Sequence, residues 1–126
     1  MPQPSVLVVD PSEETREVLR TALGRRGARM FEASGARDGL DLAREHQPTV
    51  IVLDADLEAC WPESLAQGYD EQSRRHHTPL VLLGTARRQR GMPAGEFVAK
   101  PYHYAPLILK IEQLLEQAQQ PLVRSA

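Results

Sequence analysis

Three charged residues stand directly after short apolar segments of the sequence. Asp10 follows Val-Leu-Val-Val, Asp54 follows Val-Ile-Val-Leu, and Lys100 follows Phe-Val-Ala. Neighbouring carboxylates can bind Mg²⁺, and a carboxylate can also attack phosphorus to give an aspartyl phosphate. An ammonium group beside them would neutralise negative charge on the incoming phosphoryl group. If the fold brings these residues together, they predict phosphoryl chemistry on a carboxylate.

Two further residues could take part in the same chemistry. Thr85 closely follows another apolar run, residues 80–83, and its hydroxyl could hydrogen-bond phosphoryl oxygens. Asp56 could add a third carboxylate to a magnesium site. Each also has a simpler interpretation, because Gly84-Thr85 is compatible with a plain turn and Asp56 with a charged loop that faces solvent.

Short apolar runs alternate with longer amphipathic segments along the whole chain. Such runs predict buried strands, and they lie at residues 6–9, 50–53, 80–83 and 97–99. Residues 28–33, which contain Met30 and Phe31, predict a weaker strand. The alternation is typical of a doubly wound α/β fold with a five-stranded parallel sheet. The carboxyl ends of parallel strands meet at one edge, so we expect Asp10, Asp54 and Lys100 around one crevice.

Capping residues and apolar spacing predict three of the helices. Ser12 is expected to cap a helix after the first strand, and Ser34 a helix that ends before Pro48. The last helix is expected at residues 104–119, where apolar residues recur at helical spacing.

Two other segments give weaker patterns. Residues 55–78 contain a helical pattern that Gly68 interrupts. Residues 86–95 are too few for an average helix with its connecting loops. The fourth helix is therefore expected to be very short or absent.

The composition predicts one small domain. Residues 1–126 form a single unit, with a core at about residues 5–119 and a loose tail at residues 120–126. The net charge of −2 argues against nucleic acid as the main partner. The single cysteine, Cys60, excludes a disulfide within the chain. With no signal-peptide pattern and no apolar run near ~18 residues, we expect a cytoplasmic protein without a membrane span.

These residues and their order resemble the receiver domain of two-component response regulators. The similarity spans about residues 5–119 and rests on the three segments that end at Asp10, at Asp54 and at Lys100 with its following proline. It implies a flavodoxin-like fold with strand order 2-1-3-4-5.

The resemblance also implies a role for each residue. Asp54 is the expected phosphoacceptor, which takes its phosphoryl group from a histidine kinase or a phosphotransfer protein. Lys100 is expected to contact the phosphoryl group, with a cis peptide bond before Pro101. Asp10 and Asp54 are the expected ligands of Mg²⁺, and Asp56 is a further candidate ligand.

Two positions at the predicted site depart from the receiver pattern, and a third, Phe97, agrees with it. Pro11 stands where a second acid is usual, and because proline has no side-chain ligand, Mg²⁺ binding should be weakened. Counted from the start of its strand, the switch hydroxyl position falls on Gly84, and Thr85 comes one residue late. Phe97 occupies the position of the switch aromatic residue.

The leading interpretation is a non-enzymatic signalling receiver that acts through a partner protein. A second is a degenerate receiver, a phosphorylation-independent interaction module that uses its last helix or the basic run at residues 87–90 for dimers or for an acidic partner. A remote third is a small phosphatase, because Asp54-Ala-Asp56 resembles the nucleophile and acid/base pair of haloacid dehalogenase phosphatases.

Overall fold

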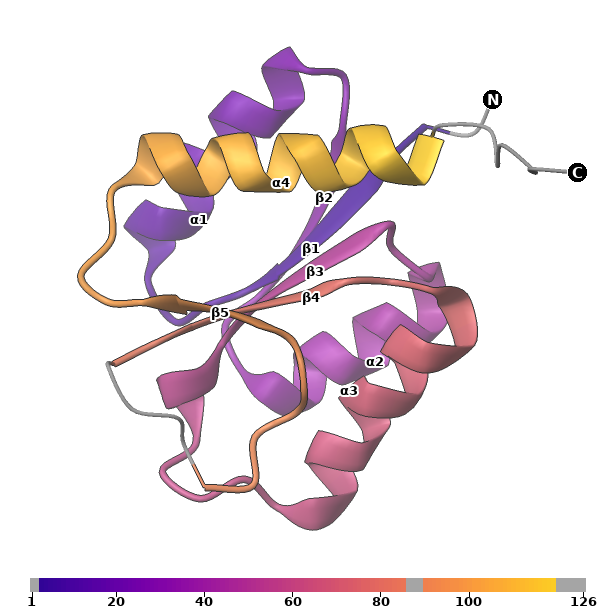
Figure 1. Ribbon diagram of the computed structural model, residues 1–126, viewed down its shortest axis with the longest axis vertical. Helices are drawn as coiled ribbons and strands as arrows, with labels where there is room; N and C mark the ends of the chain where they lie inside the picture. The colour runs from indigo at the N-terminus through magenta and orange to yellow at the C-terminus, as the bar shows by residue number, and fades with distance from the viewer. Residues whose placement is uncertain (1–2, 86–89, 120–126) are drawn as a thin grey trace, which may run out of the picture.

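The computed structural model describes residues 3–85 and 90–119, which form a five-stranded parallel sheet between two layers of helices (Figure 1). The strand order is β2-β1-β3-β4-β5, which confirms the expected doubly wound topology. The strands are β1 (Ser5–Val9), β2 (Arg29–Ala33), β3 (Val50–Asp54), β4 (Leu80–Gly84) and β5 (Glu96–Ala99). The helices are α1 (Glu13–Arg25), α2 (Ala36–His46), α3 (Glu63–His76) and α4 (Tyr104–Gln119), with a 3-10 turn, η1 (Ala55–Leu57).

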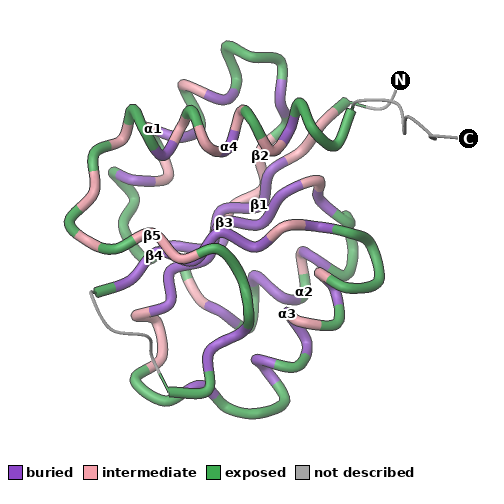
Figure 2. Tube along the Cα trace, in the orientation of Figure 1, coloured by how far each residue is buried: buried purple, intermediate pink, exposed green. Residues whose placement is uncertain are grey.

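The core lies on both faces of the central strands, which are buried along their length (Figure 2). Because side chains alternate along a strand, Leu7 and Val9 of β1 pack under α2 and α3, whereas Val6 and Val8 pack under α1 and α4. No helix within the described ranges is both long and apolar enough to cross a bilayer.

The start of α1 and the bounds of α4 match those predicted from the sequence, but the start of α2 does not. The Ser12 hydroxyl accepts a hydrogen bond from the Thr15 backbone N–H at 3.2 Å and caps α1 as predicted. The prediction that Ser34 caps the next helix is wrong, because Gly35 is the N-cap and makes no side-chain capping bond. The helix ends before Pro48 as expected, with Gln47 in the left-handed region at φ 47°.

Helix α3 is longer than its sequence pattern predicts, and the expected interruption at Gly68 is wrong. Gly68 lies inside the helix and is buried against α2. A Cβ atom at this position would lie 2.4 Å from Cδ2 of Leu40. A larger residue at this position would force the Leu40 side chain to shift, so the close approach of α2 favours glycine there, although glycine carries a propensity cost within a helix.

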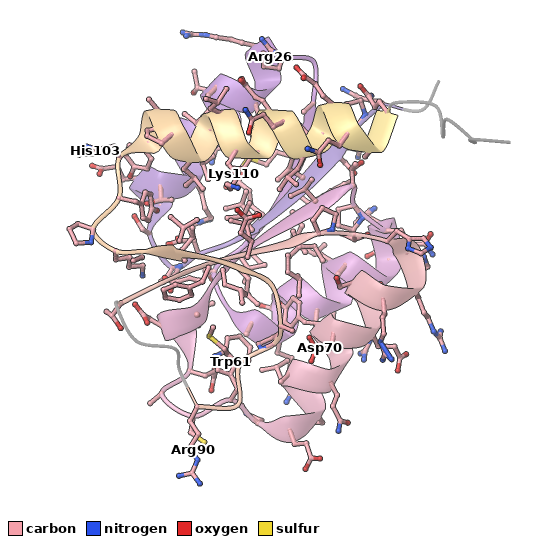
Figure 3. The ribbon with its side chains drawn as sticks, in the orientation of Figure 1. Arg26, Trp61, Asp70, Arg90, His103 and Lys110 are labelled. Atoms are coloured by element: carbon pink, nitrogen blue, oxygen red, sulfur yellow. The ribbon has the colours of Figure 1, made fainter. Side chains whose placement is uncertain are left out.

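The connection between β4 and β5 contains no helix in its described part, residues 90–95, which we call the β4–β5 segment. Its ends are attached to the region around α3 (Figure 3). The carbonyl of Arg90 accepts a hydrogen bond from the Trp61 N–H at 2.9 Å, and the Ala94 N–H donates to Asp70 Oδ1 at 2.8 Å. The fourth helix is thus absent from the described residues. The basic run continues into residues 87–89, which lie outside them.

Trp61 is the anchor of this arrangement. Its side chain is 4% exposed, and its indole N–H donates to the carbonyl of Ala55 at 3.0 Å. Its ring meets that of Tyr69 edge to face, with centroids 6.2 Å apart. Since Ala55 directly follows Asp54, the Trp61 side chain joins the end of β3 to helix α3, and the Trp61 backbone N–H adds the β4–β5 segment.

Candidate functional site

The carboxyl edge of the sheet brings the ends of β1, β3 and β5 together, as the parallel topology requires. The Lys100 ammonium lies 3.0 Å from each carboxylate oxygen of Asp54. It also lies 3.2 Å from Oδ2 of Asp56, so it bridges two carboxylates. Asp10 and Asp54 are each only 3% exposed and line one open depression of about 480 Å³ with Lys100.

Backbone N–H groups hold both buried carboxylates in place. Asp10 Oδ1 accepts a hydrogen bond from the Ser12 N–H at 2.8 Å, and Asp54 Oδ1 accepts one from the Asp56 N–H at 2.8 Å. These short loops orient the carboxylates at the strand ends, where the chain turns away from the sheet. The geometry leaves the carboxylates rigid and facing the depression.

The charges at this edge act strongly on one another. Burial and the neighbouring charge of Asp54 raise the pKa of Asp10, against the opposing effects of the Ser12 N–H and the Lys100 charge. Burial disfavours the charged form of Lys100, but its hydrogen bonds and charge interactions with Asp54 and Asp56 outweigh burial and raise its pKa. Lys100 therefore stays cationic at neutral pH.

Thr85 lies just beyond β4, with its polar groups directed at Asp56. The Thr85 N–H is 3.2 Å from Asp56 Oδ2, and its hydroxyl is 3.5 Å from Oδ1. Gly84 is the last residue of β4, and a Cβ atom there would lie 3.0 Å from Cε1 of Phe97. The ring of Phe97 thus occupies the space that a side chain at position 84 would need.

The donor set offers Mg²⁺ two carboxylates rather than three. No group of three or more His, Cys, Asp or Glu side chains in residues 3–85 and 90–119 is placed to hold a metal ion. Pro11 has no side-chain donor, and Asp56 does not line the depression that Asp10, Asp54 and Lys100 share. Asp10 and Asp54 remain, and Mg²⁺ is often held by one or two carboxylates with several waters. The residues present therefore fit a weak, water-rich magnesium site.

Sequence reasoning missed one wall of the depression. Thr15 of α1, together with Tyr102 and Tyr104 before and at the start of α4, lines it beside the carboxylates. The only sequence signal was the position of the two tyrosines shortly after Lys100. The peptide bond between Lys100 and Pro101 is cis, as the resemblance implies.

Transcriptional regulatory proteins are similar to the chain over almost its whole length. No family model matches the chain. The chain is 31% identical to the transcriptional regulatory protein AfsQ1 of Streptomyces coelicolor, over 98% of the chain and 56% of that protein. It is 28% identical to the transcriptional regulatory protein SrrA of Staphylococcus aureus, over 96% of the chain and 52% of that protein. The chain thus spans about half the length of the curated relatives it matches.

Solved structures show the same fold. The signal receiver domain of a putative Luxo repressor protein from Vibrio parahaemolyticus superimposes with a TM-score of 0.73 at 19% identity, covering 94% of each chain. The chemotaxis protein CheY4 of Vibrio cholerae superimposes with a TM-score of 0.71 at 23% identity, covering 90% of this chain and 99% of that one. The chain therefore has the fold of these receiver domains. The five-stranded parallel sheet in the order β2-β1-β3-β4-β5 confirms the fold class and strand order expected from the sequence.

Proposed function

We propose that the chain is a receiver domain that accepts a phosphoryl group on Asp54 from a histidine kinase or a phosphotransfer protein and signals through a partner protein. The observation that carries the proposal is the buried Asp54 carboxylate with the Lys100 ammonium 3.0 Å from both of its oxygens. An ammonium group in this place can neutralise an incoming phosphoryl group without reorganisation of the site. The function is that of a signalling module rather than an enzyme with a substrate of its own.

Each residue has a defined task in this proposal. An oxygen of Asp54 attacks phosphorus, and Lys100 balances the charge of the phosphoryl oxygens. Mg²⁺, held weakly by Asp10 and Asp54, would offset further negative charge on the phosphoryl group. Asp56 contacts both Lys100 and Thr85, so a change in the Lys100 contact reaches the end of β4. This is the step that would carry the signal away from Asp54.

Mass spectrometry of the intact protein tests phosphorylation. Incubation with Mg²⁺ and acetyl phosphate should add the mass of one phosphoryl group to the wild-type protein. The same treatment should add none to Asp54→Asn, because an amide oxygen is a poor nucleophile. No added mass on a folded wild-type protein would contradict the proposal and favour the interaction module. Turnover of a phosphate ester that is lost in Asp56→Asn would instead favour the phosphatase.

Restoring a second acid should strengthen metal binding. Pro11 is exposed at the rim of the depression, next to the buried carboxylate of Asp10. Pro11→Asp is expected to lower the Kd for Mg²⁺ by about tenfold, because one more carboxylate faces the ion. Calorimetric titration with MgCl₂ measures this, with Pro11→Ala as the control for loss of the proline ring. Equal Kd values for Pro11→Asp and Pro11→Ala would show that position 11 does not face the metal.

A further inference from the structure

One peptide group next to Asp54 is hydrogen-bonded at both of its polar ends. Its N–H, which belongs to Asp56, donates to Oδ1 of Asp54 at 2.8 Å. Its carbonyl, which belongs to Ala55, accepts from the indole N–H of Trp61 at 3.0 Å. Because a peptide group is planar and rigid, its N–H and its C=O turn together. The hydrogen bond that Trp61 makes therefore depends on the acceptor that the Asp54 side chain offers.

The same tryptophan holds the β4–β5 segment. The backbone N–H of Trp61 donates to the carbonyl of Arg90 at 2.9 Å, and the neighbouring Cys60 forms a parallel β-bridge with Arg90. Gly91 approaches so closely that a Cβ atom there would lie 3.2 Å from the Trp61 carbonyl oxygen. Trp61 thus connects the end of β3 to this segment, with Arg90 beside it (Figure 3).

The indole ring has little freedom to follow a movement of the peptide group. Trp61 is buried, and its ring meets the ring of Tyr69 edge to face. Tyr69 is itself fully buried, and its hydroxyl donates to the carbonyl of Ala36 at 2.5 Å. Side chains packed in this way do not shift freely. A turn of the peptide group therefore lengthens the indole hydrogen bond.

Phosphorylation changes the acceptor of the Asp56 N–H. In the unmodified protein this N–H donates to a charged carboxylate oxygen, which makes a strong hydrogen bond. The charge also polarises the peptide group, so its carbonyl is a better acceptor for the indole. When an Asp54 oxygen bonds to phosphorus, the bond from phosphorus to the leaving group breaks, and the leaving group keeps the electron pair. The carboxylate becomes an acyl phosphate, and its negative charge moves out to the phosphoryl oxygens.

We propose that Trp61 is a positioning residue through which phosphorylation of Asp54 loosens the β4–β5 segment. This inference rests on the proposed function and adds a second route to the one through Asp56 and Thr85. The peptide group turns toward the phosphoryl oxygens, and its carbonyl moves away from the indole. Trp61 then loses a bond to the end of β3 and holds Arg90 less firmly. This route needs no side chain at position 84, where the chain has glycine.

Hydrogen–deuterium exchange of the full chain tests the coupling. Exchange is followed in peptides that contain the amide of residue 61 or those of residues 90–95, with Mg²⁺ present throughout and with or without acetyl phosphate. In the wild-type protein, phosphorylation is expected to speed this exchange about fivefold, as expected for loss of one ordinary hydrogen bond. The emission of Trp61, the only tryptophan of the chain, should shift in step with the gain in mass.

Two matched variants separate the indole contact from a general loosening of the core. Trp61→Phe removes the donor to the Ala55 carbonyl, and Tyr69→Phe removes a neighbouring donor to the Ala36 carbonyl. Both variants keep an aromatic ring and lose one buried hydrogen bond, and both should still gain the mass of one phosphoryl group. In Trp61→Phe, phosphorylation should no longer change the exchange rate of residues 90–95. Tyr69→Phe should keep the fivefold response.

The outcomes distinguish this coupling from the proposed function. Phosphorylated wild-type protein in which residues 90–95 exchange no faster would overturn the coupling and leave phosphorylation of Asp54 standing. A full response in Trp61→Phe, or loss of the response in Tyr69→Phe as well, would also overturn it, because the indole would then have no special part. Wild-type protein that gains no mass would overturn the proposed function and the coupling together. If Trp61→Phe does not fold, the exchange and the emission of the wild-type protein decide.

Discussion

Replacing Lys100 by methionine is expected to slow phosphorylation of Asp54 by about a hundredfold, the usual cost of removing one charge-stabilising group from such a site. Methionine keeps most of the length of the lysine side chain but has no ammonium to balance the phosphoryl oxygens. It also removes the contacts of 3.0 Å and 3.2 Å to Asp54 and Asp56. The measurement is the rate of mass gain with acetyl phosphate at fixed Mg²⁺.

Lys110 supplies the matched control, because it is the only other lysine in the chain. It lies on α4 and pairs with Glu96 at the start of β5, away from the carboxylates. The Lys110→Met variant should be phosphorylated on Asp54 at the wild-type rate. A similar slowing in both variants would mean that lysine loss disturbs the fold and that Lys100 has no special part in the transfer.

Trp61→Ala is expected to lower the free energy of unfolding by about 3–5 kcal/mol, as is usual when a large buried aromatic side chain is removed. The change leaves a cavity against Tyr69 and leaves the Ala55 carbonyl without its indole donor. Trp61→Phe should cost less, because it keeps most of the ring and loses mainly the hydrogen bond, worth about 1 kcal/mol. Denaturant unfolding followed by circular dichroism measures both.

Leu109→Ala serves as the comparison, since this leucine is 54% exposed on α4. Its unfolding free energy should stay within about 0.5 kcal/mol of the wild-type value. If Trp61→Ala is no less stable than Leu109→Ala, then Trp61 does not anchor the connection between β4 and β5.

The strands could be predicted from the sequence because their burial is nearly complete. β3 and β4 are buried at every position, so their apolar runs have few other interpretations. The helix at the C-terminus was also predicted, because its apolar residues recur at helical spacing. The strand ends then placed Asp10, Asp54 and Lys100 at one edge by topology alone.

The sequence does not predict the features that depend on contacts between distant segments of the chain. From the sequence, Gly68 indicates an interruption of the helix, because no local pattern shows that the Leu40 side chain of α2 packs against this position. The bridge from Lys100 to Asp56 depends on the shape of η1, which the sequence does not specify. Thr15 and Tyr104 are far apart in the chain, and their hydrogen bond follows only from the packing of α1 beside α4.

The attachment of the β4–β5 segment has a consequence for the order of assembly. Its hydrogen bonds join Trp61 to Arg90 and Asp70 to Ala94, which are far apart in sequence. These contacts can form only after α3 has packed and β4 has joined the sheet, because closing a loop costs chain entropy before the contacts compensate for it. We therefore expect the segment to dock late in folding, so that loss of its contacts speeds unfolding and leaves the rate of folding almost unchanged.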